Sequence, residues 1–141
     1  MNTETNKAIV RRLIEDAWGG NRTDDLAEYV SSANRLHPGA GGTIPFGPDE
    51  MRAAIANFRR GMPDFGCRVE FLVAEGDLAV IHAHFTGTHT EPFAFAGRTL
   101  APSNRTMSVP ETLTARINGG KIVEVWATWD RLALLEQLGA A

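Results

Sequence analysis

Cysteine is almost absent from this sequence. Cys67 is the single cysteine among 141 residues, so no disulfide can form within the chain and nothing requires an oxidising compartment. A lone cysteine in a globular chain is more often a small core side chain than a reactive thiol. We therefore expect Cys67 to be structural.

Long apolar runs and clustered positive charge are missing as well. No apolar stretch approaches the roughly 20 residues of a membrane span, and the polar residues 1–7 contain no signal-peptide core. We expect a cytoplasmic protein with no membrane partner. The net charge is −3 and the 14 basic residues are scattered, which argues against a nucleic-acid partner.

What is present is typical of one globular domain, and we assign residues 1–141 to it. Apolar residues make up 43% of the chain and charged residues 22%, which is ordinary globular usage. Helical spacing predicts an amphipathic helix over 6–18, capped by Thr3 or Thr5 and ended by Gly19-Gly20. Its apolar residues are Ile9, Val10, Leu13, Ile14, Ala17 and Trp18.

Two more helices are expected before the pattern changes. Thr23 is typical of an N-cap, which predicts a second, short helix through about Val30. The composition of 31–47 is that of a loop. Pro48 at a first helical position predicts a third helix through about Arg60. Its buried residues would be Met51, Ala54, Ile55 and Phe58.

After residue 66 the apolar period changes to two, which indicates strands. The strands are expected at 67–74, 78–89, about 105–117 and 121–128, with hairpin turns between the first pair and the last pair. Asp130 is typical of an N-cap for a last short helix. Helices followed by an antiparallel meander predict an α+β domain, with helices packed on one face of a curved sheet.

Several short motifs occur together in this order. They are Arg22-Thr23-Asp24-Asp25, Met62-Pro63-Asp64-Phe65, Glu75-Gly76-Asp77, Thr86-Gly87-Thr88-His89-Thr90, the stretch from Gly119 to Trp126, and Trp129-Asp130 followed by Leu135-Glu136-Gln137-Leu138-Gly139. In order and spacing they resemble the SnoaL-like polyketide cyclases of the nuclear transport factor 2-like superfamily. The resemblance covers nearly the whole chain.

The resemblance implies a cone-shaped fold, a cystatin-like α+β barrel in which a strongly bent antiparallel sheet wraps around N-terminal helices. It implies a deep cavity for a hydrophobic small molecule such as a polyketide, and a homodimer formed through the sheet. The family's best-known enzymes close a ring by an intramolecular aldol reaction without metal or cofactor. Close relatives are associated with hydroxylation of aromatic polyketides.

The chain departs from the cyclase pattern at two positions. Aligning the Gly120-Lys121-Ile122 and Gln137-Leu138-Gly139 motifs without gaps puts Ala127 where the cyclases have their key Asp. The same register puts Leu113 where they have a His. Neither Ala nor Leu can transfer a proton, so the resemblance does not carry the cyclase mechanism over to this chain.

Glu111 is then the main catalytic candidate. Strand alternation places it on the same face as Leu113, two residues away. A carboxyl among apolar side chains would have a raised pKa and would suit an acid/base near neutrality. The structural alternative is an exposed glutamate on the outer face after Pro110. We favour the cavity because the equivalent cyclase position is polar and faces it.

His37 and His89 are the other catalytic candidates. His37 lies in the predicted loop, where relatives often place a polar residue at the cavity mouth, although an isolated loop histidine is commonly just solvated. His89 would share a face with Phe85 and could line the cavity rim, or it could make a structural hydrogen bond at the strand end. We interpret Asp130 as a cap rather than a catalytic group.

His82 and His84 share the opposite strand face, but two histidines do not make a zinc site. We expect no metal and place this pair in the sheet face or a dimer interface. Candidate substrate-binding residues line the predicted cavity, although core packing is the commoner fate of such side chains. They are Trp18, Phe58, Phe85, Leu113, Ala127 and Trp129.

Three interpretations are consistent with these features. In one, side chains fill the cavity and the sheet face mediates assembly; the other two are functions of an open cavity. The first is a cofactor-independent enzyme of polyketide or related secondary metabolism that is cyclase-, hydroxylase- or isomerase-like. It would use Glu111 with His37 or His89 as acid/base. The second is a non-catalytic protein that binds a hydrophobic metabolite, which the residues at 113 and 127 favour.

Overall fold

The computed structural model describes residues 2–39 and 41–141. Its main sheet has the strand order β2-β1-β8-β7-β4-β3, with every neighbouring pair antiparallel except β1 and β8. The strands are β1 (Val30–His37), β2 (Ile44–Pro45), β3 (Gly66–Glu75), β4 (Leu78–Thr88), β7 (Thr106–Asn118) and β8 (Lys121–Trp129). The predicted meander from β3 to β8 is confirmed.

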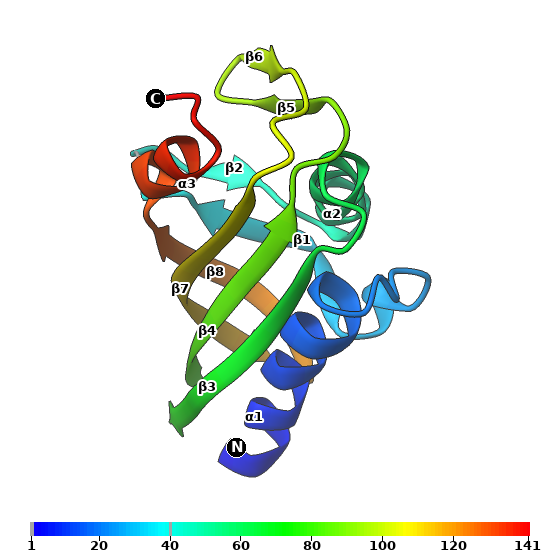
Figure 1. Ribbon diagram of the computed structural model, residues 1–141. Helices are drawn as coiled ribbons and strands as arrows, with labels where there is room; N and C mark the ends of the chain where they lie inside the picture. Colours follow the sequence, from blue (N-terminus) through cyan, green and yellow to red (C-terminus); the bar gives the residue numbers. More distant parts are fainter. Residues whose placement is uncertain (1, 40) are drawn as a thin grey trace.

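The sheet is strongly curved, so β3, β4 and β7 lie in front of β8, β1 and β2 in Figure 1. Three α-helices accompany it: α1 (Thr3–Arg12), α2 (Pro48–Gly61) and α3 (Arg131–Gln137). The α+β class and the bent sheet are as expected. None of the helices in the described ranges is long and apolar enough to cross a membrane.

The first helical segment ends at Trp18, before Gly19, as predicted, but its start and the geometry of its last turns differ from the prediction. Asn2 caps α1, because its Oδ1 accepts from the backbone N–H groups of Glu4 (2.9 Å) and Thr5 (3.2 Å). The predicted caps, Thr3 and Thr5, are therefore wrong. Beyond α1 the chain continues as a π-helix, Leu13–Trp18. This wider turn ends with a 2.8 Å bond from the Gly19 N–H to the carbonyl of Ile14, and it brings Trp18 to the concave side of the sheet.

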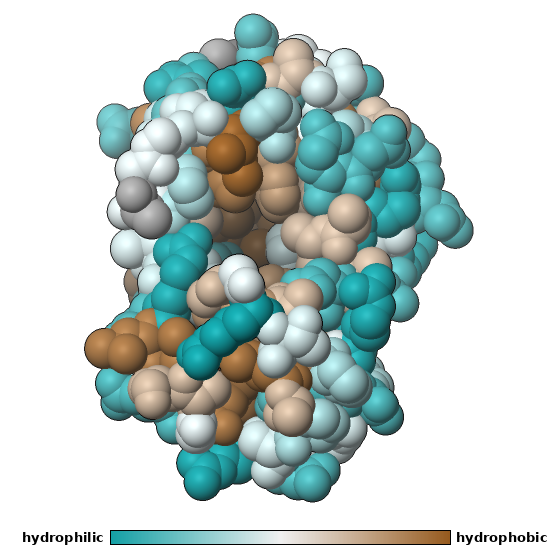
Figure 2. All heavy atoms as spheres, turned by 90° about the horizontal axis from the view of Figure 1, so that it is seen from above, coloured by the Kyte–Doolittle hydropathy of each residue, from teal (hydrophilic) through white to brown (hydrophobic). Residues whose placement is uncertain are grey.

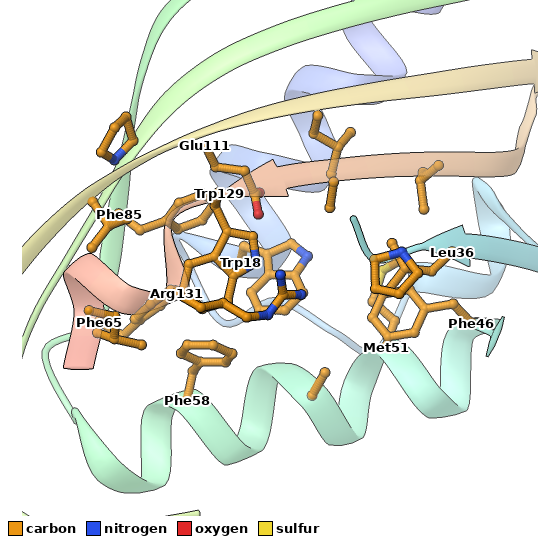
Figure 3. A pocket seen from close by; sticks show the side chains of 18 of the residues that line it. Trp18, Leu36, Phe46, Met51, Phe58, Phe65, Phe85, Glu111, Trp129 and Arg131 are labelled. Atoms are coloured by element: carbon orange, nitrogen blue, oxygen red, sulfur yellow. The ribbon is translucent and has the colours of Figure 1, made fainter. Parts of the chain in front are cut away.

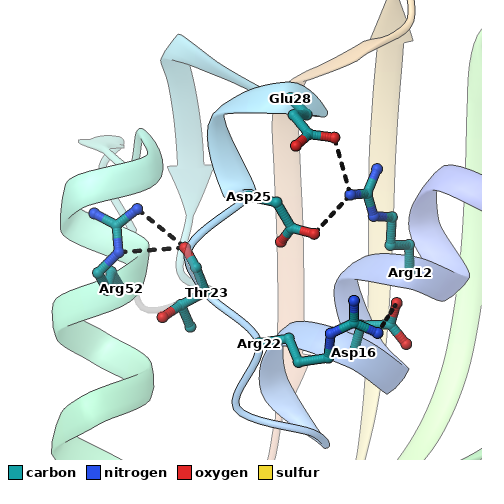
Figure 4. Close-up of polar contacts among 7 residues, drawn as sticks. All are labelled: Arg12, Asp16, Arg22, Thr23, Asp25, Glu28 and Arg52. Atoms are coloured by element: carbon teal, nitrogen blue, oxygen red, sulfur yellow. Dashed lines mark hydrogen bonds and ion pairs between the residues drawn. The ribbon is translucent and has the colours of Figure 1, made fainter.

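The predicted second helix shrinks to one 3₁₀ turn, Leu26–Glu28. Side chains of the flanking helices hold this segment, as Figure 4 shows. Arg12 of α1 contacts Asp25 at 2.7 Å and Glu28 at 3.1 Å, while Arg52 of α2 donates to the carbonyl of Thr23 at 3.0 and 3.3 Å. Thr23 therefore offers a carbonyl acceptor and is not a helix cap. The turn keeps its own backbone hydrogen bonds, from the Glu28 N–H to the Asp25 carbonyl and from the Tyr29 N–H to the Leu26 carbonyl, and the two arginines anchor it to α1 and α2.

The expected loop over 31–47 is wrong, because the segment contains β1 and β2. β1 pairs in parallel with β8, and its backbone bonds do not depend on apolar side chains. Most of its side chains keep some solvent exposure, which explains a loop-like composition. The buried Asn34 donates through Nδ2 to the carbonyl of Phe46 at 2.9 Å and ties β1 to the start of α2.

A small hairpin was also not anticipated. β5 (Phe93–Phe95) pairs with β6 (Arg98–Leu100) beside the open end of the barrel, near α2 and the C-terminus in Figure 1. Ala96 and Gly97 make its turn with φ of 54° and 77°, a left-handed conformation that glycine accommodates without steric cost. The hairpin is too short to give a periodic sequence signal.

Asp130 caps α3 as predicted, with its Oδ1 accepting from the Ala133 N–H at 2.8 Å. Asp130→Ala should lower the free energy of unfolding by about 1 kcal/mol, because an N-terminal N–H loses its partner. Urea unfolding checks this value. Asp24→Ala is the matched control, since it removes an exposed carboxylate that makes no side-chain hydrogen bond in the described structure. Equal losses in both variants would contradict the capping role.

Candidate functional site

The concave side of the sheet encloses a cavity of about 270 Å³. The floor is formed by β7 and β8, and α2 and α3 close the sides. Figure 2 views the molecule from above and shows a hollow with hydrophobic residues inside it and hydrophilic residues around it. The volume is near the lower end of the roughly 300–1,000 Å³ that is common for small-molecule sites.

Aromatic side chains form much of the cavity wall. The ring of Phe58, on α2, lies 5.9 Å from Trp18 and 6.3 Å from Trp129 between ring centroids, both in edge-to-face arrangements. Phe85 packs 6.4 Å from Trp18. The structure brings all the residues proposed for substrate binding to this lining. They are Trp18, Phe58, Phe85, Leu113, Ala127 and Trp129.

Sequence reasoning missed a further part of the wall. Leu36, Pro38 and Phe46 come from β1 and its surroundings, which had been read as a loop, so no strand alternation could be applied to them. Met51 and Ala54 come from the predicted buried face of α2. Together with the aromatic residues they make the cavity almost entirely apolar.

Glu111 is the acidic residue of this lining. It lies in β7 opposite Ala83 of β4 and Trp129 of β8, and Figure 3 shows its carboxyl pointing into the cavity. The side chain keeps some accessible surface on the cavity side, but protein atoms surround the carboxyl almost completely. No side-chain hydrogen bond compensates it within the described structure. Burial raises its pKa to about 8, against which the nearby charge of Arg131 acts in the opposite direction.

Arg131 is the cationic residue of the lining and was not among the predicted site residues. It is the first residue of α3, directly after the cap Asp130. Its guanidinium carbon lies 4.9 Å from the centroid of the Trp129 ring. Its position in the sequence could have indicated this role. Because β8 ends at Trp129, which lines the cavity, the side chains that follow it lie at the end of the cavity wall.

Leu113 and Ala127 face each other across β7 and β8, and both line the cavity. The positions that the resemblance assigns to the cyclase His and Asp are therefore neighbours on the cavity wall, but here they carry only hydrocarbon. Glu111 and Trp129 form the next pair on the same face. The carboxyl of Glu111 therefore lies one cross-strand pair away from the positions that carry the acid/base groups in the cyclases.

The structure does not bring His37 to the cavity. It ends β1, where its ring stacks on Trp126 at 4.9 Å and its Nε2 lies 2.7 Å from Oε2 of Glu124. That hydrogen bond lowers the pKa of Glu124. The expected position at the cavity mouth is therefore corrected: Pro38 turns toward the cavity, whereas His37 lies on the outer face of the sheet.

His89 is buried with 1% of its surface exposed, but it too is outside the cavity lining. Its Nδ1 accepts from the backbone N–H of Ser103 at 3.3 Å and lies 3.0 Å from the Ser103 hydroxyl. This is the structural hydrogen bond that the sequence left open as an alternative. Neither histidine shares the cavity with Glu111.

The outer-face histidines bond to separate partners. His82 contacts the Thr112 hydroxyl at 3.1 Å, and His84 contacts the carboxylate of Glu70 at 2.9 Å. In residues 2–39 and 41–141, no three His, Cys, Asp or Glu side chains are grouped to hold a metal ion.

Cys67 is half-buried, and its thiol donates to the carbonyl of Ile14 at 2.8 Å. Burial raises its pKa to about 11, which keeps the thiol protonated at neutral pH. This environment fits the structural role that was expected for the single cysteine.

The family model of the SnoaL-like polyketide cyclases matches residues 8–138 of the chain. None of the curated proteins compared with the chain matches it. Solved structures that resemble it include a proposed SnoaL-like polyketide cyclase from Jannaschia sp. CCS1, with 26% identity and a TM-score of 0.84 over 99% of this chain and 94% of that one. TsrD from Streptomyces laurentii is also 26% identical, with a TM-score of 0.83 over 100% and 99% of the two chains.

AclR from Streptomyces galilaeus, a proposed hydroxylase, shares the fold with a TM-score of 0.82. It is 21% identical over 99% of this chain and 88% of its own. Proteins named as cyclases and as hydroxylases thus share this architecture, so the fold alone does not select a reaction.

Proposed function

This chain belongs to the SnoaL-like polyketide cyclase family, and from that premise we propose that it is a cofactor-independent enzyme of polyketide or related secondary metabolism. It acts by acid/base catalysis on a hydrophobic small molecule. One observation carries the proposal: a cavity that is apolar except for Arg131 contains the carboxyl of Glu111, whose pKa is raised to about 8. A carboxylate with such a pKa is a stronger base than an exposed one.

The chemistry we propose is proton transfer at a carbon next to a substrate carbonyl. The C–H bond breaks, the proton moves to a carboxylate oxygen of Glu111, and the electron pair remains on the substrate as an enolate. The protonated Glu111 can then return a proton to carbon or oxygen. Ring closure and isomerisation both begin with this step.

Deuterium exchange tests the step without knowledge of the natural substrate. The probe is 2-tetralone, a two-ring ketone with acidic C–H bonds beside its carbonyl, incubated with the protein in D₂O and followed by NMR. We expect exchange above the buffer rate, increasing as the pH rises through about 8, because the basic form of Glu111 accumulates there. Binding of the ketone with no exchange above the buffer rate would contradict the enzyme.

A second candidate is a protein that binds a hydrophobic metabolite without converting it. Leu113 and Ala127 favour it, since the positions that carry the cyclase groups hold apolar side chains. This candidate predicts that 2-tetralone binds and quenches the fluorescence of the cavity tryptophans while its deuterium exchange stays at the buffer rate.

We also propose that the protein is a homodimer formed through the outer face of the sheet. Phe71 and Val73 of β3 support this, with 57% and 56% of their surfaces exposed. Phe71→Glu should convert the dimer to a monomer in sedimentation velocity, because it would bury a charge in the interface. Leu132→Glu is the control, since Leu132 is 58% exposed but lies on α3. A wild-type monomer, or an F71E dimer as stable as the wild type, would contradict this interface.

A further inference from the structure

Arg131 places a permanent positive charge on the cavity wall. Its guanidinium stacks over Trp129, and Figure 3 shows it extending toward the space between Trp129 and Phe58. Among residues 2–39 and 41–141 it has neither a hydrogen-bond acceptor nor an ion-pair partner. Even Glu111, the acidic group of the same cavity, forms no ion pair with it. The only interaction between them is the longer-range effect on the pKa of Glu111.

A guanidinium in this position has unused binding capacity. Stacking occupies one face of the planar group, but its N–H donors lie at the edge and remain free. A charged donor beside an apolar wall is stabilised when an anionic oxygen accepts from it, and Arg can bind a carboxylate through two parallel hydrogen bonds. The remainder of the lining offers as other side-chain donors the indole N–H groups and, when it is protonated, the carboxyl of Glu111.

We infer that the cavity binds a planar aromatic molecule that carries an ionised oxygen, a carboxylate, phenolate or enolate, and that this oxygen is held by Arg131. The rings would pack against the aromatic wall formed by Trp18, Phe58 and Trp129. This inference deepens the proposed function, because it names the substrate class for the same cavity. It assigns Arg131 to binding and leaves proton transfer to Glu111.

The protonation state of Glu111 sets the net charge of the cavity that would bind such an anion. The groups facing Glu111 are Arg131 from α3 and Cys67 from β3, while β4 and β8 contribute Ala83 and Trp129, which do not titrate. Below pH 8 Glu111 is largely neutral, so Arg131 gives the cavity a positive charge. Above pH 8 the carboxylate opposes the anion. Affinity for an anion should therefore fall between pH 7 and pH 9.

The test compares two probes of nearly equal shape, 2-naphthoate and its neutral amide, 2-naphthamide, by isothermal titration calorimetry. We expect wild-type protein at pH 7 to bind 2-naphthoate more tightly than the amide. Arg131→Gln should weaken 2-naphthoate binding by about tenfold or more, as loss of a charge-assisted hydrogen bond does, and should change amide binding less than about twofold. Arg131→Lys should recover most of the lost affinity because it retains the charge.

Two control variants complete the design. Arg60→Gln removes an exposed charge from the end of α2 and should leave both affinities unchanged. Glu111→Gln should retain 2-naphthoate binding at pH 7 and abolish its decline toward pH 9. Equal affinity for the two probes in the wild type, no effect of R131Q, or binding of neither probe would each overturn the inference. These measurements involve no turnover, so their outcome is independent of the deuterium-exchange test of Glu111.

Discussion

Replacing Glu111 with Gln is expected to slow protein-catalysed deuterium exchange of 2-tetralone by about 10²–10⁴-fold, the usual contribution of a positioned general base. Gln fills nearly the same volume but cannot accept the proton. The other residues of the described lining offer no substitute, since Leu113 and Ala127 are hydrocarbon and His37 and His89 lie outside the cavity. The loss should appear as a lower rate at saturation, with the affinity for the ketone preserved.

Glu91→Gln is the matched control for this experiment, because Glu91 is exposed and lies outside the cavity lining. It should leave the exchange rate unchanged. The exchange rate of the E111Q protein should also lack the rise through pH 8 that the wild type shows. If E111Q exchanged the ketone as fast as the wild type, Glu111 would not be the base, whatever the binding experiments on Arg131 showed.

The same substitution should stabilise the protein at alkaline pH. The pKa of Glu111 is about 8 in the folded state against 4.5 for an ordinary glutamate, so folding favours the protonated form. The contribution of Glu111 to the free energy of unfolding is fully present below pH 4.5 and is lost as the pH rises through its folded-state pKa of about 8. The whole difference corresponds to about 5 kcal/mol, and the partial exposure of the Glu111 side chain reduces our expectation to about 3 kcal/mol.

Urea unfolding of wild type and E111Q at pH 5 and pH 9 measures this effect. Near pH 5 the two proteins should differ little, since the wild-type carboxyl is then protonated in the folded state. At pH 9 E111Q should be more stable by about 3 kcal/mol. Glu91→Gln again serves as the control. A wild-type advantage at pH 9 would mean that the ionised Glu111 is well solvated in the folded protein.

The sheet was predictable because its strands alternate strongly. In β4 and β7 the apolar residues on the concave face recur every second position, so counting placed Glu111 on the same face as Leu113. Counting did not show that this face lines the cavity; that expectation came from the resemblance to the cyclases. On β8 the resemblance, rather than counting, identified the positions of Ala127 and Trp129 as part of the cavity wall, and the structure places both there. The α3 cap followed from Asp130, because an aspartate before an apolar helical pattern has few alternative roles.

The parts that could not be predicted depend on contacts between distant residues. β1 is held by backbone bonds to β8, about 90 residues away in sequence. Most of its side chains are polar and at least partly exposed, so its sequence lacks the apolar alternation that predicts a strand. His37 is placed by its contacts with Glu124 and Trp126, which belong to that distant strand. The direction of Arg131 depends on how α3 turns over the cavity, and no local pattern specifies this angle.

The offset between the two cross-strand pairs sets the depth at which a bound molecule would react. Glu111 and Trp129 lie one pair closer to the open end than Leu113 and Ala127, a step of about 7 Å along the strands. A reacting carbon at Glu111 therefore sits shallow, and the inner end of the barrel has only to accommodate an inert hydrocarbon portion. Bulky substituents could project outward past the β5–β6 hairpin, which would allow compounds with one shared inner ring and varied outer decoration to be handled by the same protein.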